Sequence, residues 1–281
     1  MIRHEQEMYN GVKIPSLGYG CWKAPQDQMT IDGVAMAIEY GFRHIDGAAA
    51  YLNEEFVGEG IKISGVDRKE LFLTSKLRNP EHGYYSTLKA FEKTINQMKV
   101  DYLDLYLIHW PVPVDFKDNY IEKNIETWKA FEKLYKENKV RSIGISNFMP
   151  HHIDELMSET DIKPMVNQIE FHPSFMQTDL INYCRKLGMV IEGYSPLANG
   201  RVFKVQELNA IAEKYDKTVA QICIRWALQH DIVTLTKSVT PERIKSNLQV
   251  FDFEISDDDM NFINSITTCE GSGNDPENIT W

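Results

Sequence analysis

Three features are missing from this sequence of 281 residues, and each absence narrows its function. No apolar stretch is long enough to cross a membrane, and residues 1–7 contain no apolar core of a secretory signal. Positive charge is scarce, because 30 Lys and Arg against 41 Asp and Glu give a net charge of -11 at pH 7. We therefore expect a cytoplasmic protein with no general affinity for nucleic acid or membranes, although a local basic pocket could hold a phosphate.

Cysteines are few, and linkers are absent. Cys21, Cys184, Cys223 and Cys269 are widely spaced and include no CxxC pair. The four could form two disulfides, but without a secretory signal we expect reduced thiols. No low-complexity tract or internal repeat divides the chain, and its length suits one barrel of alternating strands and helices. We therefore expect a single domain over residues 1–281.

Short apolar runs alternate with helical stretches, a pattern typical of buried parallel strands. Counting from Leu17, eight strands are each followed by a helix, which predicts a closed parallel α/β barrel. The expected strands cover residues 17–22, 41–46, 71–75, 103–108, 140–146, 165–170, 189–192 and 232–236. The expected helices cover residues 29–40, 54–63, 86–98, 121–137, 151–157, 178–187, 205–215, 219–229, 241–248 and 257–265.

The two ends of the chain add further elements. Asn10-Gly11, between short extended pieces, predicts a β-hairpin before the first barrel strand. Ten helical stretches for eight strands leave two extra helices in the C-terminal half. The tail over residues 270–281 is rich in Gly, Asn and Pro. We expect this tail to be a surface arm, with Trp281 packing over another part of the protein.

Four polar residues stand where apolar runs end. Asp46, Lys76 and His109 close or follow expected strands, and Tyr51 comes shortly after Asp46. The C-terminal ends of parallel barrel strands open onto one mouth, where function sits. A tyrosine pKa of about 10 is too high for easy proton exchange at neutral pH, and an ammonium such as Lys76 would lower it. The set suits protonation of an oxygen that gains negative charge, as in hydride addition to a carbonyl.

Six segments, in chain order, resemble the aldo-keto reductases. The segment DGAAAYLNE at residues 46–54 is similar to the family's Asp-x-Ala-x-x-Tyr-x-Asn-Glu motif. The other five segments are similar to the later strands and loops of the family. They are LDLYLIHWP (103–111), VRSIGISNF (140–148), NQIEFHP (167–173), GYSPL (193–197) and KSVTPERI (237–244).

This resemblance implies a fold and a reaction. The fold is the (β/α)8 TIM barrel with an N-terminal hairpin capping its bottom, and the reaction is reversible, NADPH-dependent reduction of an aldehyde or ketone. Tyr51 would be the general acid, Lys76 would lower its pKa, Asp46 would pair with Lys76, and His109 would orient the carbonyl. The family does not use a Rossmann fold, so a GxGxxG motif after the first strand is not expected.

The resemblance also implies which residues bind NADPH. Ser146, Asn147 and Gln168 would bind the nicotinamide carboxamide, and Tyr194 would stack on the nicotinamide ring. An ammonium and a guanidinium around a phosphate form a charge-assisted site. The residues expected around the remainder of NADPH are Ser195 and Leu197 at the pyrophosphate, Lys237, Ser238 and Arg243 at the 2′-phosphate, Asn247 at the adenine, and Val239 and Trp22 nearby.

The substrate pocket would be lined by Trp22, Trp110 and His109. Arg78 stands where many members carry an aromatic pocket residue, and we expect it to favour carbonyls that bear a carboxylate or hydroxyls. Ser246 stands where many members carry a Glu that contacts the adenine. The short segment 195–202 and the compact tail resemble bacterial and protozoal members such as 2,5-diketo-gluconate and methylglyoxal reductases. This layout implies a monomer acting on small aldehydes and α-dicarbonyls, without a metal.

Two other functions compete with this interpretation. A metal-dependent hydrolase on the same fold could use His44 and Asp46 at one strand end with Glu170 and His172 at another. That hypothesis leaves Lys237 and Arg243 unexplained. The chain could also be an NADPH-binding relative without catalysis, against which the intact set of four polar residues argues.

Overall fold

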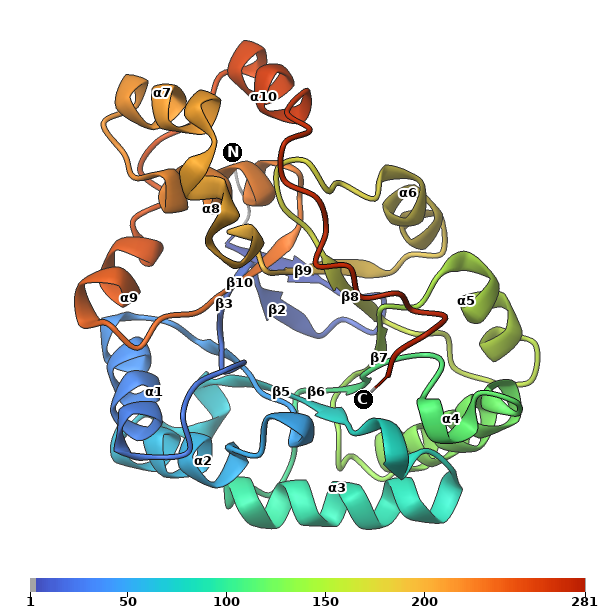
Figure 1. Ribbon diagram of the computed structural model, residues 1–281. Coiled ribbons are helices and arrows are strands. Elements are labelled where there is room, and N and C mark those ends of the chain that lie inside the picture. The colour runs from blue at the N-terminus through green and yellow to red at the C-terminus, as the bar shows by residue number, and fades with distance from the viewer. Residues whose placement is uncertain (1–3, 281) are drawn as a thin grey trace.

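The structure, a computed structural model, describes residues 4–280. Eight parallel strands form a closed barrel in the order β10-β3-β4-β5-β6-β7-β8-β9. Helices surround the strands on the outside (Figure 1). The strands are β3 (Leu17–Gly20), β4 (His44–Asp46), β5 (Phe72–Leu77), β6 (Leu105–Ile108), β7 (Ile143–Ser146), β8 (Val166–Glu170), β9 (Val190–Tyr194) and β10 (Val233–Thr236).

The helices follow the strands one by one, with two more in the second half of the chain. These two are α7 and α10, as the sequence predicted. The helices are α1 (Gln28–Tyr40), α2 (Glu54–Ile63), α3 (Tyr84–Met98), α4 (Tyr120–Lys136), α5 (Pro150–Met157), α6 (Thr178–Lys186), α7 (Gln206–Lys214), α8 (Val219–Gln229), α9 (Pro241–Leu248) and α10 (Asp257–Asn264). The (β/α)8 barrel is therefore confirmed.

Local sequence signals explain where several helices begin and end. The Asp27 side chain accepts a hydrogen bond from the Met29 amide at the start of α1, and Gly41, with φ of 118°, ends that helix. Glycine adopts this left-handed conformation without a steric penalty. Thr218 and Gln221 form a reciprocal capping box at the start of α8. Caps of this kind satisfy the backbone groups that the first and last helical turns leave unpaired.

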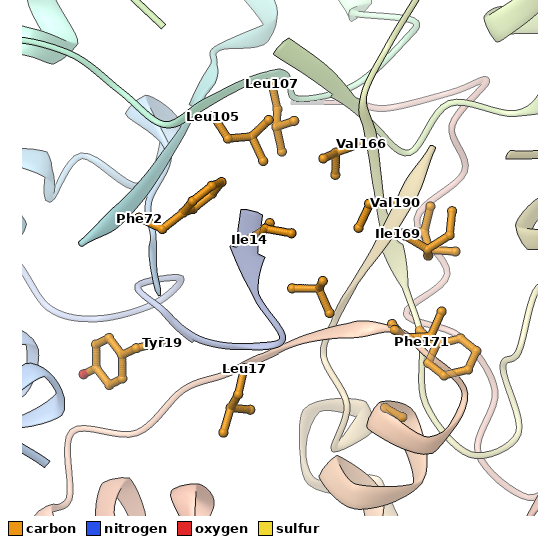
Figure 2. Packing of buried hydrophobic residues seen from close by; sticks show 14 of the residues in the cluster. Ile14, Leu17, Tyr19, Phe72, Leu105, Leu107, Val166, Ile169, Phe171 and Val190 are labelled. Carbon is orange, nitrogen blue, oxygen red and sulfur yellow. The ribbon is translucent and has the colours of Figure 1, made fainter. Parts of the chain in front are cut away.

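The predicted hairpin closes the lower end of the barrel, where the strands begin. Strands β1 (Glu5–Glu7) and β2 (Lys13–Pro15) pair antiparallel, and Gly11 adopts a φ of 83° in the turn between them. Ile14 of β2 is fully buried and lies among the labelled barrel residues Leu17, Phe72, Leu105 and Val166 (Figure 2). Apolar side chains therefore pack around the hairpin inside this end of the barrel.

Several elements begin or end one to three residues away from the predicted bounds, among them the strand at 140–146, helix α3 and the strand that carries Lys76. The strand expected at residues 140–146 begins only at Ile143, because Val140 forms a single bridge with Leu103 and Arg141 then turns its side chain to Asp104. Helix α3 begins at Tyr84 and not Ser86, because the Thr87 amide already donates to the Gly83 carbonyl at 3.0 Å. Lys76 lies inside β5 and not beyond its end.

The C-terminal tail is more than the expected surface arm. It runs from α10 across the barrel toward β7 (Figure 1), and both Cys269 and Ile279 are buried. Trp281 lies outside the described residues. All four cysteines are buried and free of disulfides, and no helix within residues 4–280 has the length and apolar character that spanning a membrane requires.

Candidate active site

A cavity of about 640 Å³ opens at the C-terminal ends of the barrel strands. Asp46, Tyr51 and His109 line this cavity, and Lys76 is completely buried behind it. The structure thus brings together the four polar residues that the sequence singled out. They come from β4, from the loop after β4, from β5 and from the loop after β6.

Lys76 is the hub of the four residues. Its Nζ donates to both carboxylate oxygens of Asp46 at 2.7 Å, to the Gly47 carbonyl at 2.8 Å and to the Tyr51 hydroxyl at 3.4 Å. Burial alone would lower the pKa of Lys76, but Asp46 and Tyr51 raise it above its ordinary value. Lys76 is therefore a permanent buried cation beside the phenol of Tyr51.

Tyr51 is held in the protonated form. Burial raises its pKa to about 12, even though Lys76 acts in the opposite direction. The expected lowering of the Tyr51 pKa by Lys76 is present, but burial outweighs it. A protonated phenol beside a fixed ammonium can donate a proton to an oxygen that becomes negative.

His109 faces Tyr51 across the cavity, with ring centroids 5.8 Å apart in an edge-to-face arrangement. Burial lowers the pKa of His109 well below its usual value, and Lys76 and His82 lower it further. The imidazole is therefore neutral at neutral pH. A neutral imidazole suits orientation of a carbonyl oxygen better than delivery of a proton.

The loop that carries Tyr51 is tied to the barrel. Tyr51 ends the short 3-10 helix Ala49–Tyr51, and Leu52 reverses the chain with φ of 58°. The buried Asn53 amide then donates to the carbonyls of Cys21 and Ala24 at 3.0 and 3.1 Å. These bonds fix the phenol above Lys76.

A second group of predicted residues lies on the far wall of the cavity. Ser146, Asn147, Gln168 and Tyr194 all line it. Asn147 takes a left-handed φ of 64° after β7, which asparagine tolerates better than most residues. Its amide donates to the His109 carbonyl at 3.1 Å, and its oxygen accepts from the Tyr194 hydroxyl at 2.8 Å. The Tyr194 ring is thus fixed on the cavity wall.

Gln168 is engaged inside the barrel. Its amide nitrogen donates to Asp46 at 3.0 Å and to Glu192 at 2.6 Å. Both amide hydrogens are used by these bonds, so only the amide oxygen is left for a ligand in the cavity.

The outer end of the cavity receives Ser195, Leu197 and Lys237. Burial lowers the pKa of Lys237, and the nearby Lys23 lowers it further. Four other predicted cofactor residues follow Lys237 but do not line the cavity itself. They are Ser238, whose carbonyl accepts from Tyr19 at 2.7 Å, half-buried Val239, exposed Arg243 and buried Asn247.

The predicted substrate residues divide. Trp22 and Trp110 line the cavity beside His109, and Trp110 stacks on the His109 ring at 6.4 Å between centroids. Arg78, in contrast, is half-buried before the 3-10 helix Asn79–Glu81 and is not among the described residues that line the cavity. The role of Arg78 at the pocket edge therefore stays a prediction.

Sequence reasoning missed several residues of the site. Lys23 lines the cavity, and its position directly after the predicted pocket residue Trp22 could have indicated this. Ser272 and Asn274 reach the cavity from the tail, and nothing local in the sequence announces this. Glu192 bonds Gln168 from within β9, at a position that looked like an ordinary strand residue.

The four residues proposed for a hydrolytic metal site do not form one cluster. His44 lies 3.4 Å from Glu192, and His172 lies 3.4 Å from Glu170. Within residues 4–280, the one group of three or more potential ligands that converge is His151, His152 and Glu277, away from the cavity lining. His152 Nδ1 accepts the Met149 amide, so the neutral ring carries its proton on Nε2, the atom a metal would need.

Comparison with known proteins agrees with the barrel fold. The sequence profile described as Aldo/keto reductase family matches residues 16–268. A glyoxal reductase of Bacillus subtilis is 47% identical over 280 residues, covering 100% of this chain and 99% of that protein. A 9,11-endoperoxide prostaglandin H2 reductase of Trypanosoma cruzi is 44% identical, covering 97% and 94%. A solved structure of a Gox0644 mutant in complex with NADPH has a TM-score of 0.91 and 39% identity, with both chains fully covered. This chain therefore belongs to the aldo/keto reductase family of oxidoreductases.

Proposed function

We propose that the protein reduces small aldehydes and α-dicarbonyls to alcohols with NADPH, with Tyr51 as the general acid. The observation that carries this proposal is the Tyr51 hydroxyl 3.4 Å from the buried Lys76 ammonium, facing His109 in one cavity. Two further facts support it. A related structure holds NADPH, and a relative with 47% identity is named a glyoxal reductase.

The chain's own residues account for the proton in this reaction. NADPH, when bound, supplies a hydride for the carbonyl carbon. His109 holds the carbonyl oxygen through its neutral ring. Tyr51 gives its phenolic proton to that oxygen, and Lys76 stabilises the phenolate that remains. Asp46 keeps Lys76 aimed at Tyr51, and Tyr51 regains a proton from water when the alcohol leaves.

The residues around the cavity suit NADPH. The Tyr194 ring, fixed by Asn147, offers an aromatic wall for the nicotinamide, and Ser146 and the Gln168 oxygen offer partners for its carboxamide. Lys23 and Lys237 place two ammonium groups at the outer end, and Arg243 and Asn247 follow on α9 at helical spacing. The ammonium groups of Lys23 and Lys237 and the guanidinium of Arg243 suit the pyrophosphate and the 2′-phosphate.

The walls of the cavity support a small substrate. Trp22, Trp110 and Tyr51 surround the reacting position with aromatic surface, and Ser272 and Asn274 of the tail narrow it. The tail thereby limits the room for a long substituent. A compact carbonyl such as methylglyoxal suits this space.

The test is NADPH oxidation, followed at its near-ultraviolet absorbance, with methylglyoxal, phenylglyoxal and a nitrobenzaldehyde. We expect turnover in the wild type and a loss of about 10²–10⁴-fold in Tyr51→Phe, with NADPH binding kept. Tight NADPH binding without turnover in the wild type would support the non-catalytic alternative. Loss of activity after EDTA would instead favour a metal enzyme.

Cofactor choice is a second arm of the same test. Arg243→Ala should weaken NADPH binding far more than NADH binding, because only NADPH carries the 2′-phosphate. Fluorescence titration of both cofactors measures this ratio. Equal losses for NADPH and NADH would remove Arg243 from the 2′-phosphate site.

A further inference from the structure

A second polar layer lies in the barrel beneath the four residues described above. Glu192 of β9 and His44 of β4 are both completely buried, with His44 Nε2 3.4 Å from Glu192 Oε1. His44 Nε2 also lies 3.1 Å from the Thr74 hydroxyl. A Cβ on Gly18 would come within 2.8 Å of the His44 ring, so glycine at that position leaves the space in which the ring sits.

The Gln168 side chain joins this layer to the upper one. The Gln168 amide nitrogen bridges Glu192 at 2.6 Å and Asp46 at 3.0 Å. The two carboxyl groups therefore share one amide, and Asp46 is the partner of Lys76. A change at Glu192 can reach Tyr51 through Gln168, Asp46 and Lys76, although Glu192 does not line the cavity.

The charges in the two layers do not balance if both carboxyl groups are ionised. Lys76 is held by both oxygens of Asp46. Burial and then Asp46 raise the pKa of Glu192 to about 8, and burial lowers the pKa of His44 to about 4. At neutral pH the His44–Glu192 pair is therefore a contact between two neutral groups and not an ion pair.

We propose that Glu192 is a positioning residue for carbonyl reduction. Glu192 anchors the Gln168 amide beside Asp46, and whether Glu192 is neutral or charged sets the electrostatic field that the Asp46–Lys76 pair exerts on Tyr51. The proposal rests on the reductase function proposed above. As a carboxylic acid, Glu192 accepts from Gln168 and can donate to His44 Nε2. Gln168 then presents its oxygen to the cofactor side.

Ionised Glu192 would place a second negative charge near one cation. The groups that face Glu192 are His44 and Asp46 from β4, Lys76 from β5 and Gln168 from β8. Val233 and Thr234 of β10, in register beside Glu192 and Gly193, add no charge. The extra charge would be compensated by Lys76, whose pKa it raises, and Tyr51 would lose part of the field that stabilises its phenolate.

The test compares Glu192→Gln with Glu192→Leu. The amide introduced by Glu192→Gln would keep an acceptor for Gln168 and a donor for His44, so it copies the neutral acid and cannot ionise. We expect the reduction rate of the wild type to fall through an inflection near pH 8, and the inflection to be absent from Glu192→Gln. One unit of Tyr51 pKa corresponds to about tenfold in proton transfer, so the alkaline loss should be roughly tenfold larger in the wild type.

Glu192→Leu should lose activity at every pH and bind NADPH more weakly, because Gln168 is released. Glu170→Gln is the matched control, since it removes another barrel carboxylate and should keep the inflection. An inflection that persists in Glu192→Gln would overturn the proposal. So would a Glu192→Gln enzyme that is as impaired as Glu192→Leu near neutral pH while still folded.

Infrared difference spectroscopy across about pH 8 tests the protonation without turnover. The wild type should lose the carbonyl stretch of a buried carboxylic acid on titration, and Glu192→Gln should show no such band. This measurement separates the two proposals. A wild type that shows the band but reduces no carbonyl would refute the reductase function and support a protonated Glu192. An active enzyme without the band would support the reductase function and refute the role proposed for Glu192.

Discussion

Two buried histidine–glutamate pairs in this barrel have the same separation and opposite electrostatics. His44 and Glu192, the inner pair, lie 3.4 Å apart inside the barrel. His172 and Glu170, the outer pair, lie 3.4 Å apart at its mouth. Burial and Asp46 raise the pKa of Glu192 to about 8. Burial would also raise the pKa of Glu170, but hydrogen bonds from His172 and Ser272 lower it below its ordinary value.

The difference lies in the donors around each carboxyl group. Glu170 accepts the Ser272 amide at 3.0 and 2.9 Å and the Ser272 hydroxyl at 2.7 Å. Glu192 accepts one amide hydrogen from Gln168 and faces a second carboxylate. Donors to a carboxylate favour its charged form, and a neighbouring negative charge disfavours it. The Glu170 carboxylate therefore holds the tail in its charged form, whereas His44 and Glu192 remain neutral beneath the site.

The largest expected effect comes from removal of Lys76, the buried cation that pairs with Asp46 above the inner pair. Lys76→Met leaves the Asp46 carboxylate buried without a partner, which should cost about 3–5 kcal/mol of unfolding free energy. Reductase activity should fall by at least about 10²-fold, because Tyr51 loses the ammonium beside its hydroxyl. Thermal unfolding and NADPH oxidation measure the two effects.

The double variant Asp46→Leu, Lys76→Met separates stability from chemistry. Replacing both members of a buried pair by apolar residues removes the unpaired charge, so much of the lost stability should return. Activity should stay low, since the cation is still missing. A single Lys76→Met variant with wild-type turnover would contradict the role given to Lys76.

The inner pair also shows where sequence reasoning stops. The barrel and the four residues at its mouth could be predicted, because apolar runs mark the strands and Asp46, Lys76 and His109 close or follow them. Glu192 could not, since its importance depends on Gln168 and Asp46 from other strands. The contact between Ser272 and Glu170 joins positions 102 residues apart, and no local pattern encodes such a distance. Arg78 was placed in the pocket because it stands two residues after Lys76, where many family members carry an aromatic residue, and this assignment stays a prediction.

The two pairs should respond to pH in opposite directions. The folded-state pKa of Glu192 is above its ordinary value of 4.5, so the native protein binds more protons there than the unfolded chain, and the stability from Glu192 declines as pH rises from 4.5 to about 8. Glu170 has a lowered pKa, so its contribution is present above its ordinary pKa and is lost as pH falls through the folded value.

Denaturant unfolding of Glu192→Gln and Glu170→Gln over a pH series checks these signs. Glu192→Gln should gain stability relative to the wild type toward pH 8, by more than about 1.4 kcal/mol, the value of one pKa unit. Glu170→Gln should be less stable than the wild type at neutral pH, and the gap should narrow on acidification. Parallel curves for the two variants would mean that the pairs do not differ as described.

The smallest expected effect concerns the outer pair alone. Ser272→Ala removes the hydroxyl that donates to Glu170 but keeps the backbone amide that donates to both carboxylate oxygens. The loss should be about 1 kcal/mol of unfolding free energy, with a modest rise in KM because residues 272 and 274 line the cavity. Ser265→Ala is the matched control, since that exposed hydroxyl bonds only within its own helix end and its removal should stay within about 0.5 kcal/mol. Equal losses of unfolding free energy in the two variants would mean that the Ser272 backbone amide and His172 alone stabilise the charged form of Glu170. The Ser272 hydroxyl would then play no part in the difference between the two pairs.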